Sequence, residues 1–248
     1  MNFHMLYAWH RAPHNALARA IPAILASITR LEPAPPIVAR FAHRHTEDPV
    51  PFTTVPDATQ RFETNHACLF RAGPDPDRPE VEFVLTPVGW TQQFEHDPSW
   101  AESGGLTAHL NGTRWSVAHI RSLFADLLAL PHLETMNVSS GPLRGVLHRR
   151  PDLRTVDFDR AYAAVHGLGL LRFFDARLTR LLGLARLPKE LQDTLYITIR
   201  SDDSAILSTP GDGDFDPHNP THMHWLETLV ARFPQLHPRR PERPPEGT

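Results

Sequence analysis

The sequence predicts a single α+β domain over residues 1–236, with a mixed or antiparallel sheet packed against several helices. Segments in which apolar and polar side chains alternate, as in half-buried strands, are mixed with segments whose apolar residues recur every three or four positions, as in helices. The two kinds of segment do not alternate regularly, so the repeated units of a parallel α/β fold are not indicated. At 248 residues, the chain can bury a large core without disulfide bonds or a metal.

The first half of the chain contains four predicted strands and two predicted helices. The strands are expected at residues 3–9, 67–71, 81–86 and 104–110, and the second and third of these are expected to pair around a Pro/Asp turn. A helix begins at an Asn15 cap or later, because Pro22 lies inside its apolar stripe. Ser116 is expected to cap a second helix.

The second half is expected to contain a strand at 133–138, a plain turn at 140–145 and two short helices. Asp157 and Asp175 are the predicted caps of these helices, which stop at Gly167 and Gly183. Residues 194–207 are predicted to form a hairpin. A last helix is expected at about 220–233, and residues 237–248, which are almost free of apolar side chains, are expected to be disordered.

The composition excludes several classes of function. Hydrophobic residues make up 41% and charged residues 21% of the chain, and the net charge is −3, which lacks the basic footprint of a nucleic-acid-binding protein. The single Cys excludes an intrachain disulfide bond and fits a reducing compartment. No signal peptide is evident, and no apolar run approaches the ~20 residues of a membrane span. We therefore expect a cytoplasmic protein without nucleic-acid or membrane partners.

The stretch "PGDGDFDPHNPTHMHW", residues 210–225, is the main candidate for a functional site. Asp212, Asp214 and Asp216 match the start of an EF-hand calcium loop, but Pro217 and Met223 occupy positions that require Gly and Glu. A zinc or manganese site built from His218, His222 and Asp216 remains an alternative, and it would indicate a metal-dependent hydrolase. The zinc-protease pattern H-E-x-x-H is absent.

A structural interpretation of this stretch explains more of its residues. Asn219 and Pro220 are a cap and first-turn pair, and Asp214 and Asp216 lie near the positive end of the helix dipole. The predicted buried face consists of Met223, Leu226, Leu229, Val230 and Phe233. Three carboxylates this close together cannot all be buried without partners, so we expect them to be solvated. No nucleophile elbow, phosphate loop or dinucleotide fingerprint occurs in the sequence, and no catalytic residue or cofactor is assigned.

Two parts of the sequence resemble a known family. The chain opens with a strand rich in aromatic residues, and a late hairpin leads through an F-D-x-x-N-P-x-H segment into the last helix; Phe215, Asp216, Asn219, Pro220 and His222 fit that segment. This resembles bacterial polymorphic-toxin immunity proteins, in particular the immunity protein 52 family. Leu170 stands where that family tends to carry Trp. The resemblance implies a small cytoplasmic α+β antidote, without enzymatic activity or cofactor, whose partner is a toxin domain, commonly a nuclease.

The acidic side chains suit such a partner, because a nuclease holds its phosphate backbone with Lys and Arg, and carboxylates opposite that surface speed association. The expected partner contacts are Asp202, Asp203, Asp212, Asp214 and Asp216, together with Trp90 as an aromatic anchor. If the hairpin folds back, the five Asp would share one acidic rim. An adaptor that loads effectors into a secretion system is the other alternative.

Overall fold

The computed structural model describes residues 3–11, 18, 20–30, 37–43, 46–51, 67–72, 81–86, 104–111, 115–149 and 169–233. Several features expected from the sequence lie outside these residues: the Asn15 cap, the helix capped by Asp157, the tail at 237–248 and Trp90. None of the helices in the described ranges is both long enough and apolar enough to cross a membrane.

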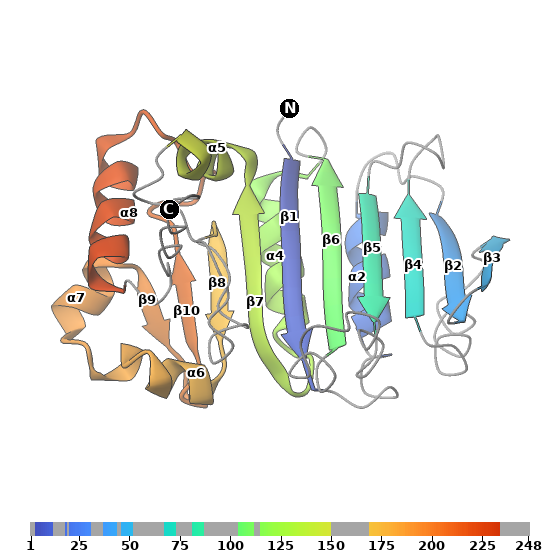
Figure 1. Ribbon diagram of the computed structural model, residues 1–248, viewed down its shortest axis with the longest axis horizontal. Coiled ribbons are helices and arrows are strands. Elements are labelled where there is room, and N and C mark those ends of the chain that lie inside the picture. The colour runs from blue at the N-terminus through green and yellow to red at the C-terminus, as the bar shows by residue number, and fades with distance from the viewer. Residues whose placement is uncertain are drawn as a thin grey trace, which may run out of the picture.

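The described strands form one ten-stranded sheet in the order β3-β2-β4-β5-β6-β1-β7-β8-β10-β9 (Figure 1). Every pairing in it is antiparallel. The strands are β1 (Phe3–His10), β2 (Ile37–His43), β3 (Thr46–Pro51), β4 (Ala67–Ala72), β5 (Val81–Thr86), β6 (Gly104–Asn111), β7 (Leu133–Ser140), β8 (Leu171–Phe174), β9 (Ile197–Ile199) and β10 (Ala205–Ser208). The α+β class and the antiparallel sheet are confirmed.

Helices pack against both faces of this sheet. The helices are α2 (Ala20–Thr29), α4 (Val117–Leu127), α5 (Gly141–Arg149), α6 (Ala176–Leu181), η5 (Leu184–Arg186), α7 (Lys189–Thr194) and α8 (Pro220–Arg232). Figure 1 shows α2 and α4 behind the sheet, and α8 beside its β9 edge.

Two hydrophobic clusters lie on opposite faces of the sheet. The first contains Phe173 together with the apolar stripes of α2 and α4, and the second contains Phe174 together with apolar residues of α5, α6 and α8. Consecutive residues of a strand point to opposite faces, so β8 contributes to both cores. All residues of β7 and β8 are buried accordingly.

A buried arginine lies on the second face of β8. The guanidinium carbon of Arg172 lies 5.0 Å from the centre of the Phe174 ring. Burial lowers the pKa of Arg172 to about 9, so the side chain stays charged at neutral pH. The polar Arg172 therefore belongs to the interior of the sheet and is not part of an accessible surface.

The three predicted caps that lie within the described residues are confirmed. The side chains of Ser116, Asp175 and Asn219 accept backbone N–H groups at the starts of α4, α6 and α8. Gly183 has a φ of 68°, which is the left-handed stop expected after α6. These elements follow from local chemistry, because a cap satisfies backbone donors that the helix itself leaves open.

Several expectations were wrong. The segment predicted as a turn at 140–145 begins helix α5, in which Pro142 occupies the first turn, where proline is tolerated. The predicted strand at 194–200 is shortened to β9, because residues 189–194 form α7. Strands β2 and β3 were not predicted, because the sequence of this region is ambiguous. The buried face of α8 includes His222 and Trp225, whereas Met223 and Val230 are only partly buried.

Candidate functional site

The loop between β10 and α8, residues 209–219, is fixed to the middle of the sheet by Asp214. One carboxylate oxygen, Oδ2, lies 3.2 Å from Nε2 of His4 in β1, and Oδ1 accepts the backbone N–H of Phe215 at 2.7 Å. Ser140, at the end of β7, also hydrogen-bonds to this carboxylate. The expectation that all three loop carboxylates are solvated is therefore wrong for Asp214, which points inward.

The pKa of Asp214 is lowered from its ordinary value of 3.8. Burial raises this pKa, but it is outweighed by the hydrogen bonds from His4 and Ser140, the charge of His4 and the Phe215 N–H. A carboxyl group whose pKa is depressed in the folded state adds stability above its unfolded pKa, and that stability is lost as the pH falls through the folded value.

We expect Asp214→Asn to destabilise the protein by about 1–2 kcal/mol at pH 7, because a charge-assisted hydrogen bond is stronger than a neutral one. The deficit should shrink below about pH 4, where the unfolded chain already binds the proton. Urea unfolding of both proteins at pH 7 and pH 3 measures this. Asp212→Asn is the matched control, because Asp212 is exposed, and its stability should stay within about 0.5 kcal/mol of the parent. An equal deficit at both pH values would contradict the assignment.

Ser140, His4 and Asp214 are the three residue types of a nucleophilic triad, but their order in space differs from one. The carboxylate of Asp214 lies between the Ser140 hydroxyl and the His4 imidazole, whereas a triad needs the imidazole between the other two. Ser140 is also fully buried. The cluster therefore fastens the loop to β1 and β7. Sequence reasoning missed it because His4 and Asp214 are 210 positions apart.

Two of the alternative metal ligands, His222 and Asp216, instead accept hydrogen bonds from backbone N–H groups of the loop before α8. Nδ1 of His222 accepts the backbone N–H of Asp216 at 2.9 Å, and its buried ring packs on Phe215. Oδ1 of Asp216 accepts the backbone N–H of His218 at 2.8 Å. Within the described ranges, no group of three or more His, Cys, Asp or Glu side chains is placed to hold a metal ion. The structure does not assemble His218, His222 and Asp216 into a metal site.

The expected single acidic rim is not formed. Asp202 and Asp203 lie in the turn before β10, whereas Asp212 and Asp216 lie in the loop after it, so the two groups are at opposite ends of the strand (Figure 1). The pKa of Asp202 is lowered, chiefly by the hydrogen bond from the Ser204 side chain. Both pairs are exposed, and each end of β10 is therefore a separate candidate contact surface.

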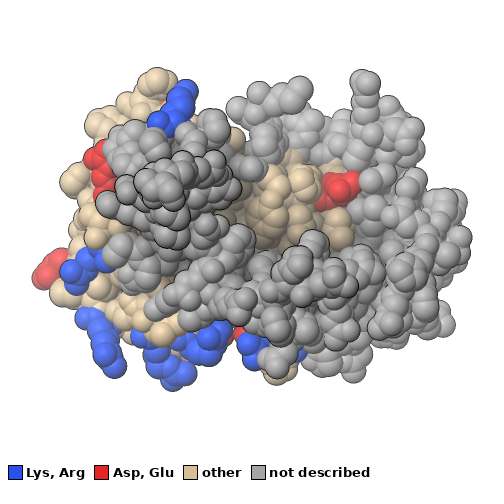
Figure 2. All heavy atoms as spheres, viewed as in Figure 1, with Lys and Arg blue, Asp and Glu red and all other residues tan. Residues whose placement is uncertain are grey.

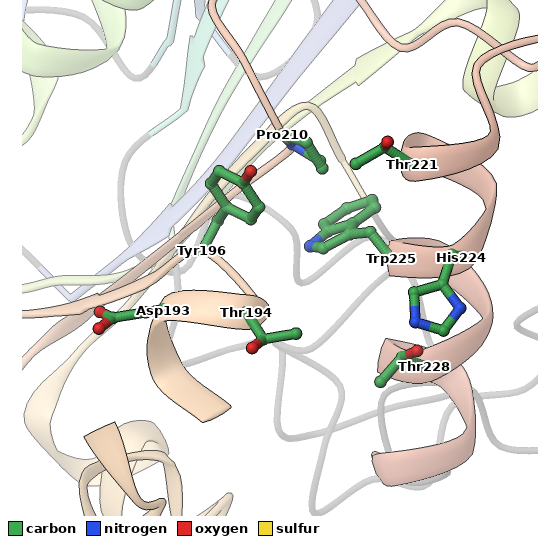
Figure 3. Close-up of a pocket in the computed structure, with 8 residues that line it drawn as sticks. All are labelled: Asp193, Thr194, Tyr196, Pro210, Thr221, His224, Trp225 and Thr228. Atoms are coloured by element: carbon green, nitrogen blue, oxygen red, sulfur yellow. The ribbon is translucent and has the colours of Figure 1, made fainter. Parts of the chain in front are cut away.

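A pocket opens between α7 and α8, and we call it the α7–α8 pocket. Its volume is about 230 Å³, and Figure 3 labels the residues that line it. In this view the ring of Trp225 lies between Tyr196 and His224. Nε1 of Trp225 donates to the backbone oxygen of Leu195 at 3.1 Å, which fixes the indole. Tyr196 is 41% exposed and has a φ of 54°, so the turn before β9 presents its ring at the surface.

The sequence did not indicate this pocket. Thr221, Trp225 and Thr228 are spaced four and three positions apart on α8 and so share one face, which is a local signal that was available. Tyr196 comes from the turn before β9, and only the packing of α7 beside α8 brings it to that face.

Basic side chains gather elsewhere, along the edge near α6. Figure 2 shows Lys and Arg along the lower border of the view, below the strands. Arg177, Arg180 and Arg186 belong to α6 and η5 and are exposed. Arg177 approaches Glu134 at 3.7 Å, and Arg11 approaches the same carboxylate at 2.7 Å. This edge and the acidic loop before α8 are distinct surfaces.

Comparisons with known proteins add a structural relative. No family model and no curated protein matches the sequence. Among solved structures, the fold is similar to that of the T6SS protein PA0821 of Pseudomonas aeruginosa, with a TM-score of 0.64 and 10% sequence identity. The match covers 100% of this chain and 78% of that chain. At this identity the likeness shows that the two chains share a fold.

Proposed function

We propose that this protein is an immunity protein, which binds a toxin carried by a bacterial secretion system and neutralises it without catalysing a reaction. The fold shared over the whole chain with a protein of the type VI secretion system (T6SS) carries this proposal. The resemblance of residues 215–222 to the immunity protein 52 family supports it from the sequence. The proposed place of action is the cytoplasm, and no cofactor takes part.

The surface proposed for toxin binding is the end of the molecule formed by the β10–α8 loop and the α7–α8 pocket. Asp212 and Asp216 are exposed there, Tyr196 supplies exposed aromatic surface, and the buried Trp225 lies in the wall of the pocket. Aromatic side chains in a concave site beside charged neighbours are typical of the energetic centre of an interface. A nuclease toxin would present Lys and Arg to these carboxylates.

The experiment is to co-express the chain with the toxin domain encoded by the neighbouring gene and to titrate the purified proteins against each other. We expect growth to be rescued and toxin activity to fall to zero at a stoichiometric ratio. An adaptor would bind the toxin and leave its activity intact. Full toxin activity in a molar excess of this protein would refute the proposal.

The two ends of β10 can be tested separately. Asp212→Asn should slow association with the toxin about twofold to threefold at low salt, and the difference should vanish near 0.5 M salt, where charges on the surface are screened. Asp203→Asn removes the same charge at the other end, where Asn tolerates the φ of 62°, and it should leave the association rate unchanged. Stopped-flow kinetics measures both rates. If Asp203→Asn slowed association and Asp212→Asn did not, the contact would lie at the β9–β10 turn.

A further inference from the structure

The tip of the β10–α8 loop, residues 212–213, lies between two contacts that fix the loop to the rest of the protein. Before the tip, the backbone oxygen of Gly211 accepts a hydrogen bond at 2.9 Å from Nη2 of Arg121 in α4. After the tip, the carboxylate of Asp214 lies 3.2 Å from the imidazole of His4 in β1. Only two residues separate the two contacts, and a segment this short between fixed ends has few conformations.

The tip itself is open to solvent. Asp212 and Gly213 are exposed, and a Cβ atom added at Gly213 would meet no atom within 4 Å. Asp212 is also one of the carboxylates proposed above to contact the toxin. The protein thus presents this charge on a short exposed tip, the two ends of which are held by α4 and β1.

The side chain of Arg121 is better suited to hold the loop than to stabilise the fold. Its Nε atom is buried and has no hydrogen-bond partner among the described residues, which costs free energy. Its bond to the Gly211 oxygen is exposed, so the net stabilisation from that bond is small. Because an apolar replacement of such a group can be neutral, Arg121→Met should leave the free energy of unfolding nearly unchanged while it removes the contact with the loop.

We propose that Arg121 and Asp214 are positioning residues, which hold the loop tip in the conformation in which Asp212 meets a basic group of the toxin. This inference rests on the proposed function, since it names the residues that prepare the contact loop for binding. A protein whose binding-competent conformation is only partly populated binds its partner more weakly by that fraction. Loss of either contact should therefore weaken binding through the conformation of the tip.

Arg121→Met and Asp214→Asn test the proposal, because they change the charge near the loop in opposite directions. With a basic toxin, a purely electrostatic role would make Arg121→Met bind more tightly and Asp214→Asn more weakly. Positioning predicts the same sign for both, and we expect each to raise the Kd for the toxin about threefold to tenfold. Isothermal titration calorimetry measures the Kd under conditions in which each variant is fully folded. Arg186→Met is the matched control, because Arg186 is exposed on η5 at the distinct basic edge, and its Kd should stay within about twofold of the parent at physiological salt.

Two glycines of the loop provide a second test. Gly213 does not have a left-handed backbone and has room for a Cβ atom, so Ala should reduce the freedom of a loosened tip. In the Arg121→Met background, Gly213→Ala should therefore lower the Kd about twofold to threefold. Gly211 has a φ of 74°, where Ala is strained, so Gly211→Ala in the parent should instead raise the Kd. A lack of recovery by Gly213→Ala would contradict the positioning role.

The order of the tip is measured without the toxin by NMR relaxation of the backbone amides of residues 211–213. We expect order parameters near ~0.85 in the parent and below ~0.6 in Arg121→Met and Asp214→Asn. A flexible tip in the parent, or effects of opposite sign on the Kd, would overturn the proposal. If the toxin binds the parent and both variants equally, the inference fails and the proposed function stands. If the toxin does not bind the parent, the proposed function fails and the positioning role fails with it.

Discussion

Replacement of Gly169 by Ala is expected to lower the free energy of unfolding by about 3 kcal/mol, a large effect for one methyl group. A Cβ atom at this position would overlap the backbone oxygen of Val138 and the side-chain oxygen of Asn137. The backbone of β7 cannot move aside, because Leu170 donates its N–H to the same Val138 oxygen at 2.6 Å. Thermal unfolding should show a Tm lower by roughly 6–12 °C.

Gly145→Ala is the matched control for this experiment. Gly145 lies in α5, and a Cβ atom added there meets no atom within 4 Å. Ala should therefore stabilise the helix by about 0.5–1 kcal/mol, because Gly loses more backbone entropy on folding. The same chemical change is thus expected to have opposite signs at the two positions. A Gly169→Ala variant as stable as the parent would contradict the close approach of residue 169 to β7.

Replacement of Phe215 by Ala is expected to destabilise the protein by about 3–5 kcal/mol. The Phe215 ring is 1% exposed, lies in the second hydrophobic cluster and is 5.6 Å from the His222 ring. Denaturant unfolding measures the loss, and Phe215→Leu should recover most of it. Leu181→Ala is the control, because Leu181 is 50% exposed and should cost less than about 1 kcal/mol.

The Phe215 result also decides what the F-D-x-x-N-P-x-H segment does. In the structure, Phe215 fills the core, Asn219 caps α8 and His222 holds the loop backbone. The Phe215→Ala variant should therefore lose toxin binding only in proportion to the fraction of the protein that is unfolded. A variant of unchanged stability that no longer bound the toxin would show that Phe215 is a recognition residue instead.

Elements whose signals are local were predicted from the sequence. Ser116, Asp175 and Asn219 each act on backbone groups two or three residues away, so their helices could be recognised without knowledge of the fold. The hairpin of β9 and β10 is similarly local. The helix at 141–149 was missed because its Gly and Pro are typical of turns, although Pro is compatible with a first helical turn.

The features that define the candidate site depend on contacts between distant segments. The side chain of Asp214 points inward because it contacts His4, and His4 lies near the loop because β1 occupies a central position in the sheet. The separation of Asp203 from Asp212 depends on the course of β10 between them. The α7–α8 pocket depends on the packing of Tyr196 beside Trp225. A one-dimensional pattern carries none of these distances, so the composition of the acidic loop was predictable but its division into inward and outward carboxylates was not.

The central position of β1 has a consequence for how the chain folds. β1 pairs on one side with β6, residues 104–111, and on the other side with β7, residues 133–140. About 100 residues must therefore leave the ribosome before the first strand finds either neighbour, and the chain entropy lost in closing such long loops slows folding. During that interval both edges of β1 are unpaired, and its apolar side chains, such as Leu6 and Ala8, lack the complete core that they enter in the folded protein. We therefore expect the protein to depend on chaperones during synthesis.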